Sequence, residues 1–416
     1  MIKKLKEKIR FLLRKSEKIT QTDMVYVAKG SFWLTMGQIL SMASSFLLAF
    51  CFANLLSRES YGTYQYVLSI FSLLSIFTLQ GIKTSYSQSV AQGFEGSLKP
   101  AIKTKIKWGL LGAALAFGMA VYYYFKGNST LAIGFSIVAG FLPFLEPLGI
   151  YDPLLSGRKL FKTLAKFSSS EQIIAALSII IVLIFTRNIF ILLLTFFSIH
   201  VIIKIIFLSI TLKRFPPNNN TDPKMVSYGR YLTYLKIIPL VASELDKILL
   251  WHFLGAAQVA IYTFALAPVI QLKDMIGKLK ILAMPKISQK SSEELKKILP
   301  KKVFRFFLLI IPIYILYVLL IPYAFKLFFP QYLSAIVYSQ VLGLIILFVP
   351  RSFLAIAFST HKKKKEVGAQ NIVEPTARII MMIILAPFLG IWGFVLAFLI
   401  GQIITFILTA RLFQRL

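Results

Sequence analysis

Apolar segments of about 20 residues recur along the whole chain, and they restrict its fold more than any other feature. A helix of that length crosses about 30 Å of hydrocarbon, and inside a bilayer the backbone amides must hydrogen-bond within their own segment. We therefore predict an all-α polytopic membrane protein with about twelve transmembrane helices. The predicted spans are 31–54, 64–85, 108–125, 130–150, 169–186, 189–212, 233–254, 258–283, 303–323, 334–358, 368–389 and 391–411.

The basic residues lie between the predicted spans and not on one soluble surface. Of the 416 residues, 57% are hydrophobic, and the formal net charge is +31. A charge of this size can indicate nucleic-acid binding, but its distribution excludes that partner here. Basic connections stay in the cytoplasm and attract anionic lipids, so we expect anionic membrane lipids as partners and both termini in the cytoplasm. The basic connections are 99–105, 158–166, 213–230, 286–302 and 362–365.

The sequence FPPNNNTDP interrupts this pattern near the middle of the chain. Pro and Asn at this density break helices and are typical of linkers. We expect a cytoplasmic linker at 215–232 between two six-helix bundles, one at 31–214 and one at 233–416. The segment 1–30 begins with apolar residues at helical spacing among lysines and arginines. That pattern predicts either a basic amphipathic helix on the membrane surface or a solvated basic tail.

Two stretches at equivalent places in the predicted bundles have similar sequences. LLSRESYGTYQYVLS at 55–69 and FLGAAQVAIYTFALA at 253–267 align at a constant offset, which pairs Tyr64 with Tyr262. An even number of helices separates them, so we expect parallel repeats about an axis along the membrane normal. Two repeated six-helix halves with a site between them are typical of transporters.

Three charged residues interrupt the otherwise apolar stretch 239–264. Glu244, Asp246 and Lys247 would lie deep in the bilayer, where a charge costs at least about 2.5–3.5 kcal/mol. Glu244 and Lys247 are three residues apart and can pair on one helix face. Asp246 points about 100° away from Lys247, so its partner must come from another helix or from water. We interpret this stretch as the wall of a polar cavity.

Further ionisable residues lie deep in other predicted spans. Glu374 and Arg378 are four residues apart on one helix, so we expect them to neutralise each other. Lys204 and Arg351 have no carboxylate within four residues on their own helices. They therefore require an acidic partner on another helix or a bound anion.

Glu146, Lys83 and Asp274 complete the candidates. Glu146, in the turn LPFLEPLG, serves either as a helix-end hydrogen-bond acceptor or as a hinge or ion site. Lys83 either extends to the cytoplasmic interface or contacts substrate. Asp274 and Lys278 are four residues apart and are expected to pair.

Deep cations outnumber deep carboxylates in this set. A net positive cavity, also lined by Tyr, Ser and Thr, favours an anionic, polar cargo such as a phosphate or pyrophosphate. The alternative is that all these charges are structural pairs between the two halves. The candidate substrate-binding residues are Lys247, Lys204, Arg351, Arg378, Lys83 and Tyr262, and the candidate cavity or coupling-ion carboxylates are Asp246, Glu244, Asp274, Glu146 and Glu374.

The sequence contains no catalytic or metal-binding pattern. His200, His252 and His361 are far apart and lack metal-ligand spacing, and neither a glycine-rich phosphate loop nor a G-x-S-x-G motif occurs. We therefore expect no enzyme activity, no catalytic residue, no metal and no cofactor. Without a nucleotide-binding module, energy must come from an ion gradient, the membrane potential or cargo flow. A proton or a sodium ion is the expected coupling ion.

Four stretches spread over both halves carry a family resemblance. They are LLSRESYGTYQYVLSIFSLLSIFTLQGI at 55–82, ELDKILLWHFLGAAQVAIYTFALA at 244–267, PKIS at 285–288 and LGIWGFVLAFLIGQ at 389–402. In their order and spacing they resemble the polysaccharide repeat-unit flippases (Wzx-type O-antigen and capsule flippases). That family is part of the multidrug/oligosaccharidyl-lipid/polysaccharide (MOP) exporter superfamily.

The resemblance implies a MATE-like fold of two six-helix bundles around a V-shaped cavity, working by alternating access. The implied cargo is an undecaprenyl-pyrophosphate-linked oligosaccharide, moved across the bacterial cytoplasmic (inner) membrane for surface polysaccharide biosynthesis. A polysaccharide polymerase and a chain-length regulator are the implied protein partners. Asp246 and Lys247 match the family's motif, with Tyr262 following. The chain has fewer predicted spans than the peptidoglycan-precursor flippases of this superfamily, which disfavours lipid II as the cargo.

Other functional classes make different demands on the sequence. A multidrug or organic-ion antiporter of the same superfamily needs a carboxylate-rich cavity for cationic compounds, which the deep charge balance disfavours. A non-transporting membrane scaffold for polysaccharide assembly would tolerate neutralisation of the deep charges. A membrane glycosyltransferase needs a larger catalytic region outside the membrane than the short outer connections supply.

Overall fold

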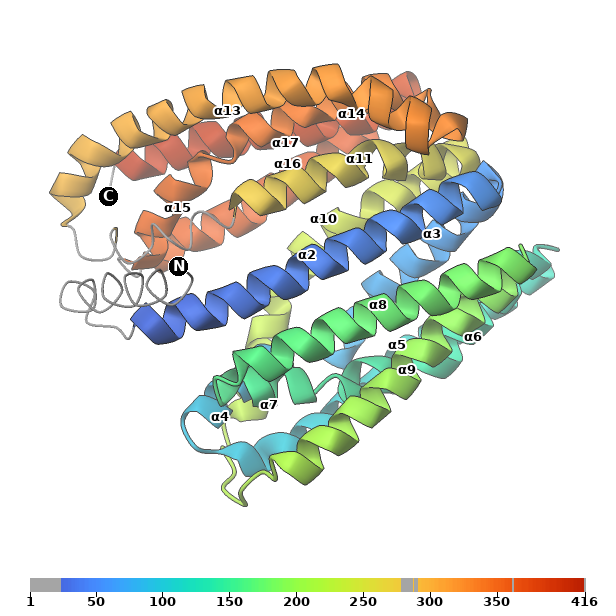
Figure 1. The fold of residues 1–416 in the computed structure, drawn as a ribbon, viewed down its shortest axis with the longest axis vertical. Coiled ribbons are helices and arrows are strands. Elements are labelled where there is room, and N and C mark those ends of the chain that lie inside the picture. Colours follow the sequence, from blue (N-terminus) through green and yellow to red (C-terminus); the bar gives the residue numbers. More distant parts are fainter. Residues whose placement is uncertain (1–23, 278–286, 288–290, 361–362, 415–416) are drawn as a thin grey trace, which may run out of the picture. The chain divides into compact units, whose positions relative to one another are not determined.

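A computed structural model of the protein (Figure 1) describes residues 24–277, 287, 291–360 and 363–414. These residues form helices and their connections, with no strand among them. Within the same residues, nine helices are long and apolar enough to cross a membrane, and two bent helix pairs bring the number to eleven. The predicted all-α polytopic fold is confirmed, and the chain is a multi-pass membrane protein.

One further helix of the predicted set, α10 (Met225–Leu254), is 30 residues long. At about 1.5 Å per residue it exceeds the thickness of the hydrocarbon core. Its second half carries three charged residues close together, Glu244, Asp246 and Lys247. This helix therefore combines membrane-spanning length with buried charge.

Large apolar side chains cover the outward faces of the helices. Phe185, at the end of α8 (Phe161–Phe185), is 84% exposed, and Phe388, near the end of α16 (Lys364–Leu389), is 83% exposed. In water, each Å² of such surface is unfavourable by about 25 cal/mol, whereas lipid tails are as apolar as the side chains. The bilayer is therefore the solvent that this surface requires.

The chain divides into two compact units. Unit 1 consists of Met1–Leu55 and Phe71–Lys236, and unit 2 consists of Leu56–Ile70 and Ile237–Leu416. Two helices contribute to both units, because α3 (Arg58–Leu74) begins in unit 2 and ends in unit 1, whereas α10 begins in unit 1 and ends in unit 2.

In unit 1, α5 packs against α6, α2 against α8, and α6 against α9 (Figure 1). Asn128 caps α6 by accepting a hydrogen bond from the Leu131 N–H at 3.0 Å, and Asn188 caps α9 by accepting one from the Phe190 N–H at 2.8 Å. The helices of this unit, besides those already given, are α2 (Met24–Leu55), η1 (Ser75–Thr78), α4 (Gly81–Ala91), η2 (Glu95–Ser97), α5 (Leu98–Phe125), α6 (Ser129–Leu148), α7 (Tyr151–Gly157) and α9 (Ile189–Arg214).

In unit 2, α16 packs along α17, and α11 packs against α14 (Figure 1). Ser291 caps α13 by accepting a hydrogen bond from the Glu294 N–H at 3.3 Å. The helices of this unit, besides those already given, are α11 (Ala256–Gly277), α13 (Ser292–Phe328), η3 (Pro330–Tyr332), α14 (Ala335–Leu342), η4 (Gly343–Phe348), α15 (Arg351–Thr360) and α17 (Ile391–Gln414).

Two predicted spans are bent rather than continuous. In the span 64–85, Arg58–Thr78 and Gly81–Ala91 meet at 48°, because Leu79 adopts the left-handed conformation (φ 54°) and ends the first helix. In the span 334–358, Ala335–Phe348 and Arg351–Phe358 meet at 42°. Pro350 lies at this second break, and it lacks the N–H that would continue the helical hydrogen bonds.

The two repeated stretches pack directly on each other inside unit 2. The Tyr61 ring of α3 lies 5.0 Å from the Phe264 ring of α11, measured between centroids, and the Tyr66 and Trp251 rings stack at 4.6 Å. Gly62 makes this approach possible, because a Cβ there would lie 1.8 Å from the backbone oxygen of Ala256. The first part of α3 therefore belongs to unit 2 through its contact with the repeat-related helix.

The Pro- and Asn-rich connection between α9 and α10 is fixed to unit 1 by polar contacts. Arg158 forms a bidentate ion pair with Glu95, and these hydrogen bonds raise the pKa of Arg158. Glu95 Oε2 also accepts the Asn218 N–H at 3.0 Å, and Arg158 Nη2 donates to the Pro216 carbonyl at 2.8 Å. The connection thus has a defined conformation at the corner between α4 and α5.

Several sequence predictions lie outside the described residues. They concern the amphipathic helix within 1–30, the partner Lys278 of Asp274, and most of the PKIS motif at 285–288.

Gly62→Ala is expected to destabilise the protein, because the added methyl group would overlap a backbone oxygen that cannot move away as a flexible side chain would. Overpacking of this kind costs about 1–3 kcal/mol, so the thermal unfolding midpoint in detergent should fall. Gly118→Ala in α5 is the matched control, since nothing lies within 4 Å of its Cβ position. Equal midpoints for both variants would contradict the proposed contact.

Candidate functional site

Asp246 is the centre of a buried ionic cluster in unit 2. Its side chain is 1% exposed, and its Oδ2 accepts hydrogen bonds from Tyr262 Oη at 3.1 Å and from Arg378 Nη2 at 3.2 Å. Arg378 Nη2 also donates to the Ala242 carbonyl at 2.6 Å, and the guanidinium lies 4.1 Å from the Phe398 ring centroid. A buried charge requires such pairing. The sequence predicted that the partner of Asp246 comes from another helix or from water, and Arg378 of α16 is that partner.

A second pair in unit 2 joins Arg351 of α15 to Glu374 of α16. Arg351 Nη2 lies 3.4 Å from Glu374 Oε2, and Gln402 of α17 donates to Glu374 Oε1. The prediction that Glu374 and Arg378 neutralise each other is wrong, because each side chain pairs with a different helix. The requirement that Arg351 find an acidic partner on another helix is confirmed.

The predicted pair on α10 is confirmed, whereas Asp274 lies at the surface. Lys247 Nζ is 3.4 Å from Glu244 Oε2, at the expected three-residue spacing. Asp274, near the end of α11, is exposed, and the neighbouring Lys273 interacts electrostatically with it and with Glu374. Glu244 and Lys247 therefore form a local pair, and Asp274 is separate from the buried clusters.

In unit 1, Lys83 of α4 pairs with Glu146 of α6. The Lys83 Nζ to Glu146 Oε2 distance is 2.9 Å. A second ammonium group lies beside Gly149, which follows α6, because a Cβ there would lie 3.4 Å from Lys83 Nζ and 3.8 Å from Lys204 Nζ. The two ammonium groups repel each other, so nearby carboxylates must neutralise them.

Glu171 supplies one of these carboxylates and was missed by sequence reasoning. Its Oε1 lies 3.8 Å from Lys204 Nζ, and its Oε2 accepts a hydrogen bond from Tyr151 Oη at 2.9 Å. Asp152 of α7 also interacts electrostatically with Lys83 and Lys204. Asp152 lies in the first turn of α7, and Glu171 lies at the start of the predicted span 169–186, although α8 already begins at Phe161. A charged residue beside a basic connection is unremarkable in the sequence, so only the fold brings these acids to the lysines.

The predicted location of Lys105 is also wrong. It was assigned to a basic cytoplasmic connection, but α5 begins at Leu98 and buries the Lys105 side chain completely. Its Nζ donates to the Thr78 carbonyl at 3.0 Å, at the break between η1 and α4. A carbonyl at a helix end lacks an intrahelical donor, and Lys105 supplies one from another helix.

Every candidate cation therefore lies within 4.0 Å of a carboxylate of its own unit. In the sequence, the deep cations outnumbered the deep carboxylates. Glu171 and Asp152 supply the additional negative charge in unit 1. The pairs differ in access, because the side chains of Lys83 and Lys247 are 31% and 21% exposed, whereas that of Arg378 is 11% exposed. A soluble anion thus reaches Lys83 and Lys247 more easily than Arg378.

No group of three or more His, Cys, Asp or Glu side chains is arranged to hold a metal ion in the described part of the chain. His200 instead lies with its Nδ1 2.8 Å from the Phe196 carbonyl, one turn away on α9. The side chains of the clusters are ammonium, guanidinium and carboxylate groups, whose chemistry is ion pairing and, for the carboxylates, proton or cation binding.

Comparison with known proteins identifies the family. Residues 27–276, more than half of the chain, match the family described as polysaccharide biosynthesis protein, and the chain belongs to that family. A membrane protein of Methanocaldococcus jannaschii named MJ1068, described as uncharacterized, is 24% identical over 91% of this chain and 82% of its own length.

Solved structures show the same fold at low sequence identity. An inward closed lipid II flippase, MurJ, matches with a TM-score of 0.66 and 14% identity over 90% of this chain and 86% of its own. An inward-facing multidrug resistance MATE family transporter of the MOP superfamily matches with a TM-score of 0.62 and 12% identity, over 90% and 94%. The chain therefore shares the fold of these two membrane proteins, and the MATE-like fold that the sequence resemblance implied is confirmed.

Asp246→Asn and Arg378→Gln are each expected to lower thermal stability strongly, because each leaves a buried partner unpaired. Breaking a buried ion pair costs about 3–5 kcal/mol. The double variant should lose less than the sum of the two single losses, since it leaves neither charge unpaired. The measurement is the unfolding midpoint of the purified proteins, and strictly additive losses would show that the two side chains do not depend on each other.

Proposed function

We propose that the protein is a flippase that moves undecaprenyl-pyrophosphate-linked oligosaccharide repeat units across the bacterial cytoplasmic membrane. The family's description as polysaccharide biosynthesis protein supports this role, as does the fold shared with a protein named lipid II flippase. The observation that carries the proposal is the set of intramembrane lysines held by carboxylates and still partly accessible.

The cargo binds by exchanging partners with these carboxylates. A pyrophosphate oxygen replaces Glu146 at Lys83, and a comparable exchange replaces Glu244 at Lys247. Phosphate and carboxylate both form charge-assisted hydrogen bonds with an ammonium group, so the exchange leaves no buried cation unpaired. In the described part of the chain, Arg351 Nη1 and Arg378 Nε are buried without a hydrogen-bond partner, and they offer further donors as the clusters rearrange.

Alternating access then carries the head group to the other side of the membrane. The sugars lie in a water-filled lumen, and the polyprenyl tail stays in the lipid. Helix bends at Leu79 and Pro350 supply places where segments reorient, and prolines inside helices weaken them further. These prolines are Pro143, Pro147, Pro239, Pro268 and Pro312.

This function places both termini and the basic connections in the cytoplasm, where the lipid-linked cargo is assembled. A polysaccharide polymerase and a chain-length regulator on the outer side would use the product. The coupling ion is a proton or a sodium ion, and Glu146 binds it after Lys83 has turned to the head group.

Lys83→Gln should slow translocation at least about tenfold, the equivalent of one lost charge-assisted hydrogen bond. The assay follows a labelled lipid-linked oligosaccharide in proteoliposomes, with protein abundance measured in parallel. The double variant Lys83→Gln/Glu146→Gln removes both charges and leaves no carboxylate unpaired, and it should remain slow. Lys326→Gln, at an exposed lysine of α13, is the control and should match the wild type. Recovery of the rate in the double variant would show that the pair is purely structural.

Glu146→Gln should abolish the response of translocation to an imposed ion gradient. The same proteoliposomes are measured with a proton gradient, a sodium gradient and neither. The wild type should respond to one of the two gradients. A gradient response retained by Glu146→Gln would contradict the assignment of the coupling site.

A further inference from the structure

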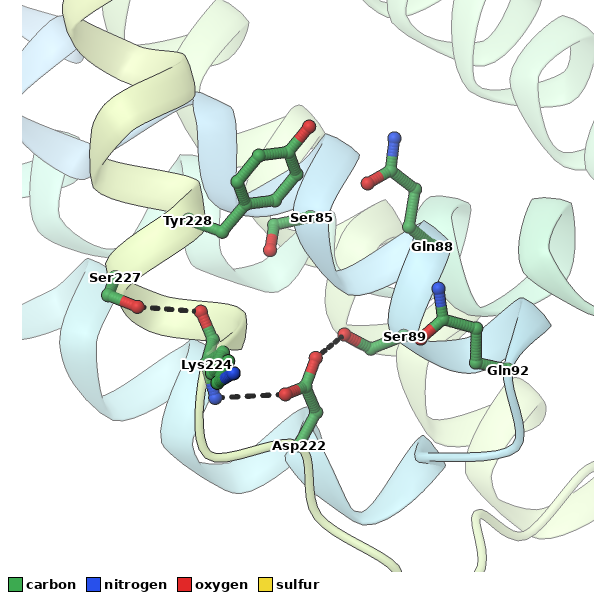
Figure 2. A pocket seen from close by; sticks show the side chains of 8 residues that line it. All are labelled: Ser85, Gln88, Ser89, Gln92, Asp222, Lys224, Ser227 and Tyr228. Atoms are coloured by element: carbon green, nitrogen blue, oxygen red, sulfur yellow. Dashed lines mark hydrogen bonds between the residues drawn. The ribbon is translucent and has the colours of Figure 1, made fainter.

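A pocket lined by polar residues lies within unit 1, between α4 and the start of α10 (Figure 2). Its volume is about 580 Å³, inside the range of about 300–1,000 Å³ that is typical of ligand pockets. Ser85, Gln88 and Ser89 line it from α4, Gln92 lines it directly after the end of α4, and Tyr228 lines it from α10. None of these residues belongs to the candidate site described above.

The walls of the pocket are held in place by close helix packing. Gly81 and Gly229 allow α4 and α10 to touch, because a Cβ at Gly81 would lie 2.3 Å from the Gly229 carbonyl oxygen. Ser85 Oγ donates to the Met225 carbonyl at 2.6 Å, and Ser89 Oγ donates to Asp222 Oδ2 at 2.7 Å. The pocket is therefore preorganised, since its backbone and its inner hydroxyl groups already have fixed partners.

Other side chains of the pocket keep their polar groups available. Gln88 and Gln92 are exposed, and within the described residues their amides have no protein hydrogen-bond partner (Figure 2). Tyr228 is 43% exposed, and its ring extends a surface that continues to Tyr231, whose ring lies 6.3 Å away between centroids. The pocket therefore presents two amides and a flat aromatic ring to a ligand.

The charges of the pocket balance. Asp222 and Lys224 are its only charged lining residues, and Asp222 is already engaged by Ser89 and by the Lys224 N–H. A pyrophosphate offers only acceptors and needs an excess of cationic donors, which this pocket lacks. A sugar offers hydroxyl groups that donate and accept, which matches the paired donor and acceptor of each glutamine amide. The C–H face of a sugar ring also packs on the apolar face of a tyrosine.

We infer that this pocket binds a saccharide, with Gln88 and Gln92 on its hydroxyl groups and Tyr228 against its ring face. The inference rests on the proposed function, because it assigns the sugar part of the cargo to a site separate from that of the pyrophosphate. It predicts that recognition of the sugar and recognition of the anion respond to different substitutions.

The test measures binding of free oligosaccharides to the full-length protein in nanodiscs. The probes are tri- and tetrasaccharides of hexoses and N-acetylhexosamines without lipid or phosphate, first on an array and then by calorimetry. The wild type should bind a subset of them, and Gln88→Ala and Tyr228→Ala should each weaken that binding by at least about tenfold. Tyr234→Ala is the matched control, since Tyr234 lies on the same helix outside the pocket and is 66% exposed.

Absence of saccharide binding by the wild type, or equal binding by Tyr228→Ala and Tyr234→Ala, would overturn the inference. Displacement of the saccharide by inorganic pyrophosphate would also overturn it, because that result makes the pocket an anion site. Translocation assays separate the two proposals. Saccharide binding without any translocation refutes the flippase proposal alone, whereas translocation that Tyr228→Ala and Gln88→Ala leave intact, with no saccharide binding, refutes only the pocket assignment.

Discussion

A charge inside a bilayer must have a partner, and this requirement organises the structure. Asp246 is almost completely buried, and its carboxylate accepts hydrogen bonds from Arg378, from Tyr262 and from the Lys247 N–H of its own helix. Glu374 connects α15 and α17 to α16 in the same way. Removal of one partner leaves the other uncompensated at a cost of several kcal/mol. The ion pairs therefore fix how helices pack, and in the proposed function they also hold the cations that bind an anionic cargo.

The length and apolarity of the segments predicted the helical membrane fold, because the hydrocarbon thickness and the backbone hydrogen-bond requirement leave few other solutions. The interruption at Pro350 has a visible cause in the sequence. The interruption at Leu79 has none, since a leucine in the left-handed conformation is imposed by packing and has no local signature. The sequence also does not indicate that α3 and α10 each contribute to both units. That division depends on contacts between distant residues, such as Gly62 against Ala256.

The candidate site was predictable where its partners share a helix. The three-residue spacing of Glu244 and Lys247 gave their pair correctly, but the four-residue spacing of Glu374 and Arg378 was misleading. Helix spacing shows only which side chains can meet. Asp246 and Arg351, on other helices, pair with Arg378 and Glu374 instead. Glu171 and Lys105 were missed for a related reason. Glu171 falls at the start of the predicted span 169–186 and Lys105 falls before the span 108–125, and only the fold places them beside a lysine and a free carbonyl.

The most direct measurement of partner exchange is an experimental structure of the protein with a lipid-linked saccharide pyrophosphate bound. In the free protein, Lys83 Nζ lies 2.9 Å from Glu146 Oε2. Partner exchange predicts that this contact opens in the complex and that a phosphate oxygen takes the place of the carboxylate at Lys83. A complex that holds the pyrophosphate elsewhere, with Lys83 still bound to Glu146, would contradict it.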